Sequence, residues 1–544
     1  MKKQSFHEKE LSILRNAVDN IEKKTGYTLL NNPSIKNIIE IVEQFLRDRK
    51  LICYGGTAIN NILPLEDQFY DKKVELPDYD FYSPDPLKDA KDLADIYYNN
   101  GYEEVEAKAG MHPGTFKVFV NYIPVADITY LVDDIYKNIK KRAIVVDNIY
   151  YTPVNYLRMS MYLELSRPQG DVSRWEKVLK RLSLLNKHYP LKGKNCNKEE
   201  IQRLFQYGTK KTIVNANASS KGTSKANSIS ITQSILSNTN SNTKNELLNN
   251  LTNVESEIFT TTRDTLVAQG CIFFGAYANR MILKQHPKIN KIPVPRIPDF
   301  DVLSLEPENT ARIIKERLTD IGIKGIKTIK RPGVGEIIAP HYEVKVGNET
   351  LVFIYEPLAC HSYNILRTGG KKVRIATIDT MLSFYLSFAF VDRKYYKENR
   401  ILCMSEYLFD VQQKNRLSQK QLLKRFTLDC YGNQMTKEKM RAEKSDRYKE
   451  LKNSKNKKDY EWYFLRYIPS ENNEFNVSKT QKKKKQTNKQ TKKQTNKQTK
   501  KQTKKSKTLK TKNKTKNKSK TLKKKKKTKT KTQPAKKLTL FSLL

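Results

Sequence analysis

The stretch of sequence that decides the fold reads Leu51-Ile-Cys-Tyr-Gly-Gly-Thr-Ala-Ile-Asn-Asn-Ile-Leu63. Its first four residues form a short apolar run, typical of a buried strand, and residues 57–63 favour a helix. Gly55 and Gly56 lie between the two. A glycine pair at this point lets backbone N–H groups approach a phosphate closely, at the positive end of the helix dipole. The Thr57 hydroxyl could then donate to a terminal phosphate oxygen. Taken alone, a Gly-Gly pair more often forms a turn that binds no phosphate.

Acidic residues follow on the next predicted strand, 79–82. Asp78 and Asp80 are separated by one residue, and alternate residues of a strand point to the same face. Two converging carboxylates repel each other unless a cation lies between them, and Mg²⁺ prefers such oxygen ligands. Asp127 lies in the apolar run 123–130, where an unpaired carboxylate is costly. A strand carrying Asp127 beside the first would complete a two-metal site. The alternative is a strand-end turn with solvated Asp side chains.

The surrounding segments alternate between helical and strand patterns. This order predicts an α/β (α+β) fold with mixed sheets flanked by helices. Helices are predicted over residues 38–46, 87–99 and 154–165, and strands over residues 102–107, 116–122 and 125–131. The apolar segment 381–391 is too short to span a bilayer and predicts a buried helix.

The same motifs occur twice in the chain. Residues 54–63 align with 274–283 at an offset of 220, and 77–83 with 298–304 at an offset of 221; residues 124–127 pair with 357–360. Three ordered matches indicate two tandem domains of one fold. The second copy keeps the first glycine as Gly275 and the acid pair as Asp299 and Asp301. It has Ala276 in place of the second glycine and Cys360 in place of the third acid. Because a neutral thiol cannot replace a carboxylate on a hard metal ion, we expect the second copy to be inactive and to serve in RNA binding or dimer formation.

Positive charge is concentrated at one end of the chain. The 544 residues include 103 Lys and Arg against 57 Asp and Glu, a formal net charge of +46. Residues 479–537 hold 29 Lys and no acid, which leaves +17 for the rest. This low-complexity segment predicts a disordered tail that binds polyanions by counterion release. Residues 212–245, rich in Asn, Ser and Thr, predict a flexible linker or surface loop.

These patterns divide the chain into five segments. The expected segments are a first, catalytic domain (1–204), a linker or loop (205–250), a degenerate second domain of the same fold (251–400), a basic helical region (401–475) and a disordered Lys-rich tail (476–544).

Cysteine usage and the amino terminus bear on location. The six Cys are scattered, without a CxxC pair, which predicts free thiols, a reducing intracellular compartment and no zinc site. The first residues lack the apolar core of a signal peptide. We therefore expect a soluble protein that is not secreted and does not enter membranes.

The three-part motif carries a family resemblance. Gly-Gly-Thr, then Asp-x-Asp, then a later strand Asp resembles the DNA polymerase β-like nucleotidyltransferase superfamily. With its duplication and basic body, the chain is similar over about residues 36–400 to the poly(A) polymerase catalytic subunit of large cytoplasmic DNA viruses, in its giant-virus (Mimivirus-like) form. The gap between Gly56 and Asp78 is longer than is usual for the family, so an inserted loop over about residues 64–76 must fit near the site.

The resemblance implies roles for the motif residues. Gly55, Gly56 and Thr57 would hold the nucleotide phosphates. Asp78 and Asp80 would bind both of two Mg²⁺ (or Mn²⁺) ions, and Asp127 would bind the ion that activates the RNA 3′-hydroxyl.

The implied activity is that of a polynucleotide adenylyltransferase. It would add AMP from ATP, without a template, to the 3′ ends of single-stranded mRNA and release pyrophosphate. A homodimer and a location in virions and the host cytoplasm are implied in the same way. Two alternatives stay open: a terminal uridylyl- or CCA-type nucleotidyltransferase, and a non-catalytic RNA-binding virion protein. Arg158 and Arg167, on or just after a helix, would either neutralise triphosphate charge or lie on the surface.

Overall fold

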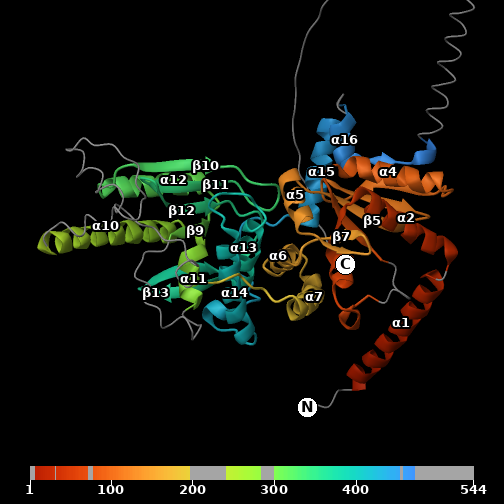
Figure 1. Cartoon of the computed structure of the whole chain (residues 1–544), viewed down its shortest axis with the longest axis horizontal. Coiled ribbons are helices and arrows are strands. Elements are labelled where there is room, and N and C mark those ends of the chain that lie inside the picture. Colours follow the sequence, from red (N-terminus) through yellow and green to blue (C-terminus); the bar gives the residue numbers. More distant parts are fainter. Residues whose placement is uncertain are drawn as a thin grey trace, which may run out of the picture. The chain divides into compact units, whose positions relative to one another are not determined.

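The computed structural model of the chain describes most of the residues before the Lys-rich tail (Figure 1). The described ranges are 6–30, 32–70, 77–196, 241–283, 299–453 and 457–471. The chain divides into two units, residues 1–473 and 474–544, and every described residue belongs to the first. The predicted disorder of the tail, and the predicted linker as far as residue 240, lie outside the described residues.

The first domain is an eight-stranded mixed sheet with helices packed on it. Its helices are α1 (Phe6–Leu30), α2 (Pro33–Arg49), α3 (Gly55–Ile62), α4 (Pro86–Asn99), α5 (Asp133–Lys141), α6 (Val154–Leu165) and α7 (Trp175–His188), with short 3-10 turns η1 (Leu65–Asp67) and η2 (Val172–Arg174). Its strands are β1 (Ile52–Cys53), β2 (Tyr79–Ser83), β3 (Val105–Ala109), β4 (Thr115–Val120), β5 (Ile123–Tyr130), β6 (Ile144–Val146), β7 (Ile149–Tyr151) and β16 (Arg466–Tyr467). The strand order is β16-β3-β4-β5-β2-β1-β7-β6.

The second domain is built in the same way. Its helices are α10 (Ser241–Ala268), α11 (Gly275–Leu283), α12 (Pro307–Asp320) and α13 (Ile378–Phe388). Its strands are β8 (Ile272–Phe274), β9 (Phe300–Leu303), β10 (Ile326–Arg331), β11 (His341–Val346), β12 (Glu349–Tyr355), β13 (His361–Thr368), β14 (Lys371–Ala376) and β15 (Cys430–Tyr431). The remaining elements are α14 (Glu398–Lys414), η3 (Gln421–Leu423), α15 (Lys437–Leu451) and α16 (Lys457–Phe464).

Strand order confirms the predicted duplication. The second sheet runs β10-β11-β12-β9-β8-β14-β13-β15, which repeats the order β3-β4-β5-β2-β1-β7-β6 of the first. The parallel pairs correspond as well: β2 with β5 and β1 with β7 in the first sheet, β9 with β12 and β8 with β14 in the second. The fold class predicted from the sequence, two tandem mixed sheets flanked by helices, is therefore confirmed.

The register corrects one step of the sequence alignment. Asp80 lies opposite Asp127 in the first sheet, and its counterpart Asp301 lies opposite Phe353 in the second. The prediction that Cys360 takes the place of the third acid is therefore wrong, since Cys360 falls after β12 ends. The conclusion that the second copy lacks a third carboxylate stands, with the fully buried Phe353 at that position.

Two predicted boundaries also change. Residues 241–250, assigned to the linker, belong to helix α10, because apolar residues at 247, 251, 254 and 258 continue a helical spacing. The predicted basic helical region also adds an edge strand to each sheet. Strand β15 pairs with β13, and β16 pairs with β3.

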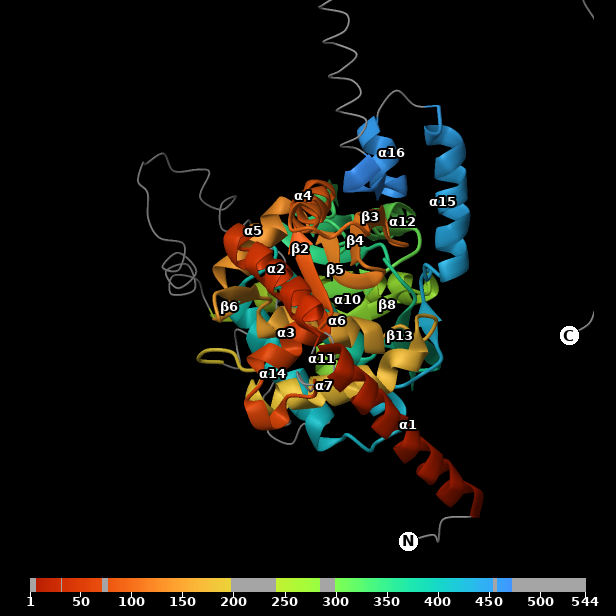
Figure 2. The ribbon, with the colours of Figure 1, turned by 90° about the vertical axis from the view of Figure 1, so that its right-hand side faces the viewer.

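Helix α2 shows how the apolar pattern anchors the first sheet. It begins where the Asn32 side chain accepts from the Ser34 backbone N–H, with Pro33 in the first turn, and both features favour a helix start. Its buried residues recur every three or four positions: Ile35, Ile38, Val42, Phe45 and Leu46. Each such side chain contributes roughly 1.5–3 kcal/mol by leaving water. Helices α2 and α4 contact each other and pack on the first sheet (Figures 1 and 2).

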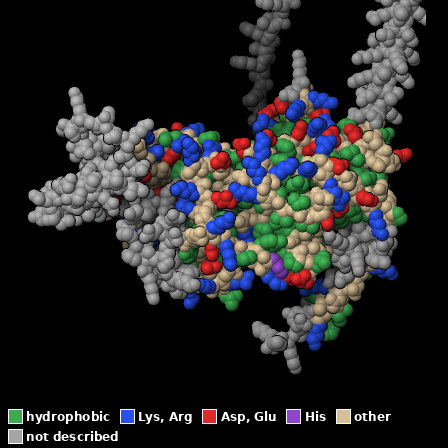
Figure 3. Space-filling view, viewed as in Figure 1, with side chains coloured by type: hydrophobic (Ala, Val, Ile, Leu, Met, Phe, Trp, Pro, Cys, Tyr) green, Lys and Arg blue, Asp and Glu red, His purple; other side chains and the backbone are tan. Residues whose placement is uncertain are grey.

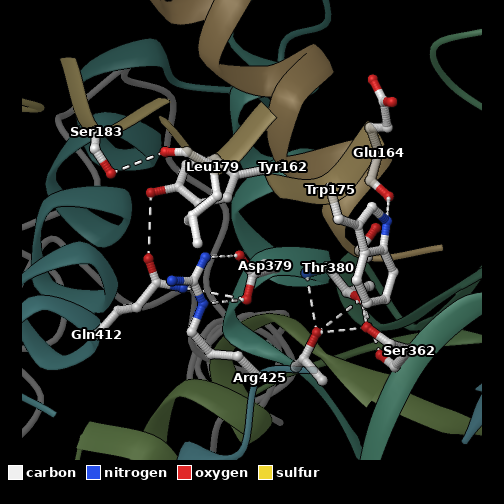
Figure 4. Close-up of polar contacts among 12 residues, drawn as sticks. Tyr162, Glu164, Trp175, Leu179, Ser183, Ser362, Asp379, Thr380, Gln412 and Arg425 are labelled. Atoms are coloured by element: carbon white, nitrogen blue, oxygen red, sulfur yellow. Dashed lines mark hydrogen bonds and ion pairs between the residues drawn. The ribbon is translucent and has the colours of Figure 1, made fainter. Parts of the chain in front are cut away.

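A buried polar network lies where the two domains meet. Helix α6 packs against α13, the predicted apolar helix, in which every residue is buried. Asp379 of α13 accepts two hydrogen bonds from Arg425, at 2.9 and 2.5 Å, and a third from Gln412 at 3.3 Å (Figure 4). Tyr162 of α6 donates to the same Gln412 at 3.3 Å. The network thus joins the first domain to the second through charged and amide groups.

Four of the six cysteines form disulfides. Cys196 is joined to Cys403, and Cys360 to Cys430. The prediction of free thiols is wrong for these four, so the cysteines no longer argue for a reducing compartment. The residues of the second pair lie 70 positions apart and those of the first 207, and sequence spacing alone does not reveal such pairs. Cys53 and Cys271 are free and buried.

The surface of the described residues mixes both signs of charge. Figure 3 shows Lys and Arg side chains spread over the visible face, with Asp and Glu between them. None of the helices in the described ranges carries an apolar stretch long enough to cross a membrane.

Candidate functional site

Strand β2 separates the core of the first domain from the site. Phe81 packs against Phe45 of α2 at 6.3 Å between ring centroids, and the Tyr79 hydroxyl donates to Glu43 of the same helix at 2.5 Å. Because strand residues alternate, Asp80 points to the opposite face. It is half-buried there, whereas Tyr79 and Phe81 are buried. The α2 side of the sheet therefore holds the core, and the other side holds the acids.

The three predicted acids lie close enough to interact. Asp80 and Asp127 are paired across the parallel strands β2 and β5, so their side chains share a face. Burial, together with the charges of Asp78 and Asp127, raises the pKa of Asp80 to about 7. Burial and Asp127 also raise the pKa of Asp78. The structure thus brings the three residues singled out from the sequence into one electrostatic cluster.

The glycine turn packs directly on this cluster. Gly55 has φ +74°, and a Cβ added to it would lie 2.5 Å from Oδ2 of Asp80, so only glycine fits. The Tyr54 backbone N–H donates to the Asp80 carbonyl at 2.9 Å. The Thr57 hydroxyl donates to the Asp78 carbonyl at 2.6 Å, so it supports the acid strand in this structure. A contact between Thr57 and a phosphate stays a prediction and would require that hydrogen bond to break.

A lysine that the sequence analysis missed lies on the third acid. Lys117 of β4 is paired directly with Asp127 of β5, and its ammonium donates to the Asp127 carboxylate. Within the described ranges, no three carboxylate, imidazole or thiol groups are already arranged around one metal position. The donor types nevertheless fit Mg²⁺, because all three are carboxylates. The pKa values of Asp78 and Asp80 are raised, and Asp127 is paired with the Lys117 ammonium, so each of the three favours a nearby cation. Metal binding would require Lys117 to move off Asp127.

A basic face of α7 lies beside the turn and the acids. Arg174, just before the helix, and Lys177 act on the charges of Asp80 and Asp78 respectively. The Arg181 guanidinium lies 3.0 Å from where a Cβ of Gly56 would stand, and it donates to the Tyr70 hydroxyl at 2.6 Å. Positions 174, 177 and 181 share one helix face. This basic face was not predicted, although its i, i+3, i+7 spacing is present in the sequence.

Arg158 and Arg167 behave differently from each other. Arg158 is buried, and its guanidinium donates to Asn155, to the Tyr189 carbonyl and, at 2.8 Å, to Asn186. It therefore joins α6 to α7, and the expectation of a surface position is wrong for it. Burial lowers the pKa of Arg167 to about 10, and its Nε has no hydrogen-bond partner among the described residues.

The equivalent site in the second domain is filled by aromatic rings. Gly275 repeats the positive φ of Gly55 and the close approach to an acid, here Asp301. Phe353 packs on Tyr395 at 5.0 Å between centroids, and Tyr355 packs on Phe274 at 5.5 Å. These rings occupy the face where the first domain carries Asp127. This packing supports the prediction that the second copy is inactive.

The fold and the acid cluster can be compared with the sequence-based expectation. A mixed sheet with a glycine turn after one strand, a paired acid on the next and a third acid on the parallel neighbour matches the arrangement that the resemblance predicts for a nucleotidyltransferase module. The chain contains two such modules, of which only the first has all three acids.

Part of the first module is similar to a known protein family. Residues 40–171 match the family model of the poly(A) polymerase catalytic subunit. A protein of Acanthamoeba polyphaga mimivirus is 35% identical over 158 residues, which are 28% of this chain and 26% of that protein. A protein of African swine fever virus (strain Badajoz 1971 Vero-adapted) is 33% identical over 167 residues, 30% of this chain and 35% of that protein. Both are named as poly(A) polymerase catalytic subunits, and the match spans about a third or less of their length.

A solved structure extends the likeness to most of the chain. The Megavirus polyadenylate synthase superposes with a TM-score of 0.65 at 18% identity, over 89% of this chain and 91% of that one. This likeness concerns the fold. The family resemblance inferred from the motifs is confirmed for residues 40–171, and the two-sheet architecture is shared with the Megavirus enzyme.

Proposed function

We propose that the chain is a template-independent RNA nucleotidyltransferase that adds AMP from ATP to RNA 3′ ends. The observation that carries the proposal is the pair of Asp80 and Asp127 on one face of the first sheet, with Asp78 just before strand β2, next to the glycine turn. The match of this region to the poly(A) polymerase catalytic subunit family supports it.

The basic face of α7 supports one direction for the bound triphosphate. Arg174, Lys177 and Arg181 follow the acids toward Gly56, and a triphosphate laid along them would place its α-phosphorus at the acids. The RNA 3′-oxygen then attacks that phosphorus, the bond to the oxygen bridging toward the β-phosphorus breaks, and pyrophosphate leaves on the α7 side. The hydroxyl proton passes to water.

Asp78, Asp80 and Asp127 would hold the divalent ions that the family implies. When bound, Mg²⁺ or Mn²⁺ would supply charge neutralisation at the phosphates and a lower pKa for the attacking hydroxyl. Before binding, the protein compensates part of the acid charge with Lys117, whose ammonium lies on Asp127. The protein's own contribution is to hold the Asp80 and Asp127 carboxylates together by strand pairing, with Asp78 two residues before Asp80.

An extension assay with four separate nucleotides tests the proposal. Labelled single-stranded RNA is incubated with the full chain, Mg²⁺ and one of ATP, UTP, CTP or GTP. The proposal expects a long ladder with ATP alone, and none with the Asp78→Ala variant. A ladder with UTP, or a short addition of CTP and ATP, would favour the uridylyl- or CCA-type alternative. Absence of extension with every nucleotide would favour a non-catalytic RNA-binding protein.

Assembly and location remain proposals from the resemblance. A homodimer is the expected assembly, and helix α1 offers a surface for it, because Phe6, Ile13, Leu14 and Val18 on this helix are exposed. Sedimentation with and without residues 1–30 tests this surface. Location in virions and the host cytoplasm follows from the viral relatives and is tested by fractionation of infected cells.

A further inference from the structure

A deep cleft opens beside the acid cluster, with walls from both domains. Its volume is about 570 Å³. The first domain contributes Tyr54, Tyr82 and Thr129, and the second domain contributes His361, Phe384 and Ser387. Helix α6 contributes Tyr156, Met159, Ser160 and Leu163 to the lining. The role proposed above for the first domain does not account for this space.

The cleft begins at one end of the acid cluster. Tyr82 and Thr129 follow Asp80 and Asp127 by two positions on their strands, so they lie on the same face, one step further along. The Tyr54 ring stacks on Tyr82 at 4.1 Å between centroids, and its hydroxyl contacts that of Thr129 at 2.9 Å. Thr57, which follows the glycine pair, and Lys177 of α7 lie toward Asp78, at the other end. The acids therefore separate the cleft from the expected triphosphate site.

The lining of the cleft suits a planar, uncharged group. It combines aromatic rings with aliphatic side chains, and the Arg167 guanidinium in it is opposed by the Glu336 carboxylate. A phosphate would gain little from such a balanced pair, whereas a base can stack on the rings. His361 is only 2% exposed, yet neither ring nitrogen has a hydrogen-bond partner among the described residues. Buried polar groups without partners are rare, so these nitrogens point to a ligand edge that donates and accepts.

We propose that this cleft holds the base of the RNA 3′-terminal nucleotide, and that the inactive second domain supplies one wall of the acceptor site. The inference rests on the proposed nucleotidyl transfer. In an in-line displacement the attacking and leaving oxygens lie on opposite sides of the phosphorus. Because pyrophosphate leaves toward α7, the acceptor approaches from the cleft. The second domain therefore has a role in substrate binding even though its own site is filled.

Photocrosslinking locates the terminal base directly. RNA carrying one 4-thiouridine at its 3′ terminus is irradiated with the full chain, and the crosslinked peptides are identified by mass spectrometry. The proposal expects crosslinks to cleft residues such as Tyr130, Phe384 or Trp462. A matched RNA with the probe several nucleotides upstream should not label them. Crosslinks of the terminal probe that fall only outside the cleft would overturn the proposal.

A cleft-filling variant gives an independent kinetic readout. Ser160 is exposed and lines the cleft from α6, where its hydroxyl donates to the carbonyl four residues earlier. Ser160→Trp should raise the KM for RNA tenfold or more and leave the KM for ATP within about twofold. Thr319→Trp is the matched control, because Thr319 makes the same helical hydrogen bond at an exposed site on α12.

The outcomes separate the two proposals. If the wild-type chain fails to extend RNA, the proposed function fails. If the wild type extends RNA and Ser160→Trp leaves both KM values unchanged, the acceptor site is elsewhere. If the variant raises only the KM for ATP, the cleft holds the incoming nucleotide and the present assignment is wrong.

Discussion

Replacing Asp80 by Asn should stabilise the protein at alkaline pH when divalent ions are absent. Burial and two neighbouring carboxylates raise the pKa of Asp80 from 3.8 to about 7. Between these values the carboxyl is protonated in the folded chain and ionised in the unfolded one. Stability is therefore lost as the pH rises through this window, and the loss is complete above about pH 7. Asp80→Asn removes the charge and its penalty.

The size of the effect follows from the same pKa. A rise from 3.8 to about 7 corresponds to on the order of 4 kcal/mol between the two protonation states, and we expect roughly 2–4 kcal/mol to be recovered. In thermal unfolding with a chelator, Asp80→Asn should raise Tm by several degrees at about pH 8 and have little effect at about pH 4. Asp446→Asn, at an exposed carboxylate, is the control. A Tm that is unchanged or lower at pH 8 would refute the crowded-carboxylate reasoning.

Three further substitutions test separate parts of the structure. Gly55→Ala should lower the free energy of unfolding by roughly 2 kcal/mol or more, because the alanine is held in a left-handed conformation and its Cβ meets the Asp80 carboxylate. The control Gly101→Ala, with φ +91° and open space around it, should lower it by only about 1–2 kcal/mol. Urea unfolding measures both variants, and equal losses would show that the contact with Asp80 is unimportant. Asp379→Ala should lower the free energy of unfolding by about 3–5 kcal/mol, because it leaves the buried Arg425 guanidinium unpaired. Replacing both Asp379 and Arg425 by apolar residues should recover most of this loss, and a small loss in the single variant would contradict the reasoning. Lys117→Gln should lower severalfold the Mg²⁺ concentration that gives half-maximal thermal stabilisation, since a competing cation leaves Asp127; an unchanged titration would show that Lys117 does not compete.

The local features of the site were predictable from the sequence. The strand, glycine turn and helix of residues 51–63, and the alternation of Asp78 and Asp80, depend on short-range geometry, and the structure has them within a few residues of the predicted places. Asp127 could be predicted as a site residue because a carboxylate in an apolar strand needs a partner. These are the features for which spacing alone decides which side chains share a face.

The features that escaped prediction depend on pairing across the fold. Lys117 reaches Asp127 only through the register of β4 on β5, and Phe353 takes the position of the third acid only through the register of β12 on β9. A one-residue change in register exchanges the two faces of a strand, so a short motif such as the one around Cys360 misleads. The basic face of α7 was different, since its spacing was present in the sequence and only its position beside the acids required the structure.

The central claim is that the first domain performs the chemistry and the second does not. The most direct test compares turnover of the full chain with Asp80→Ala and with Asp301→Ala, at saturating ATP and RNA, alongside thermal unfolding of both variants. The account predicts a loss on the order of a hundredfold or more for Asp80→Ala and near wild-type turnover for Asp301→Ala. Comparable losses in both folded variants, or full turnover without the Asp80 carboxylate, would contradict it.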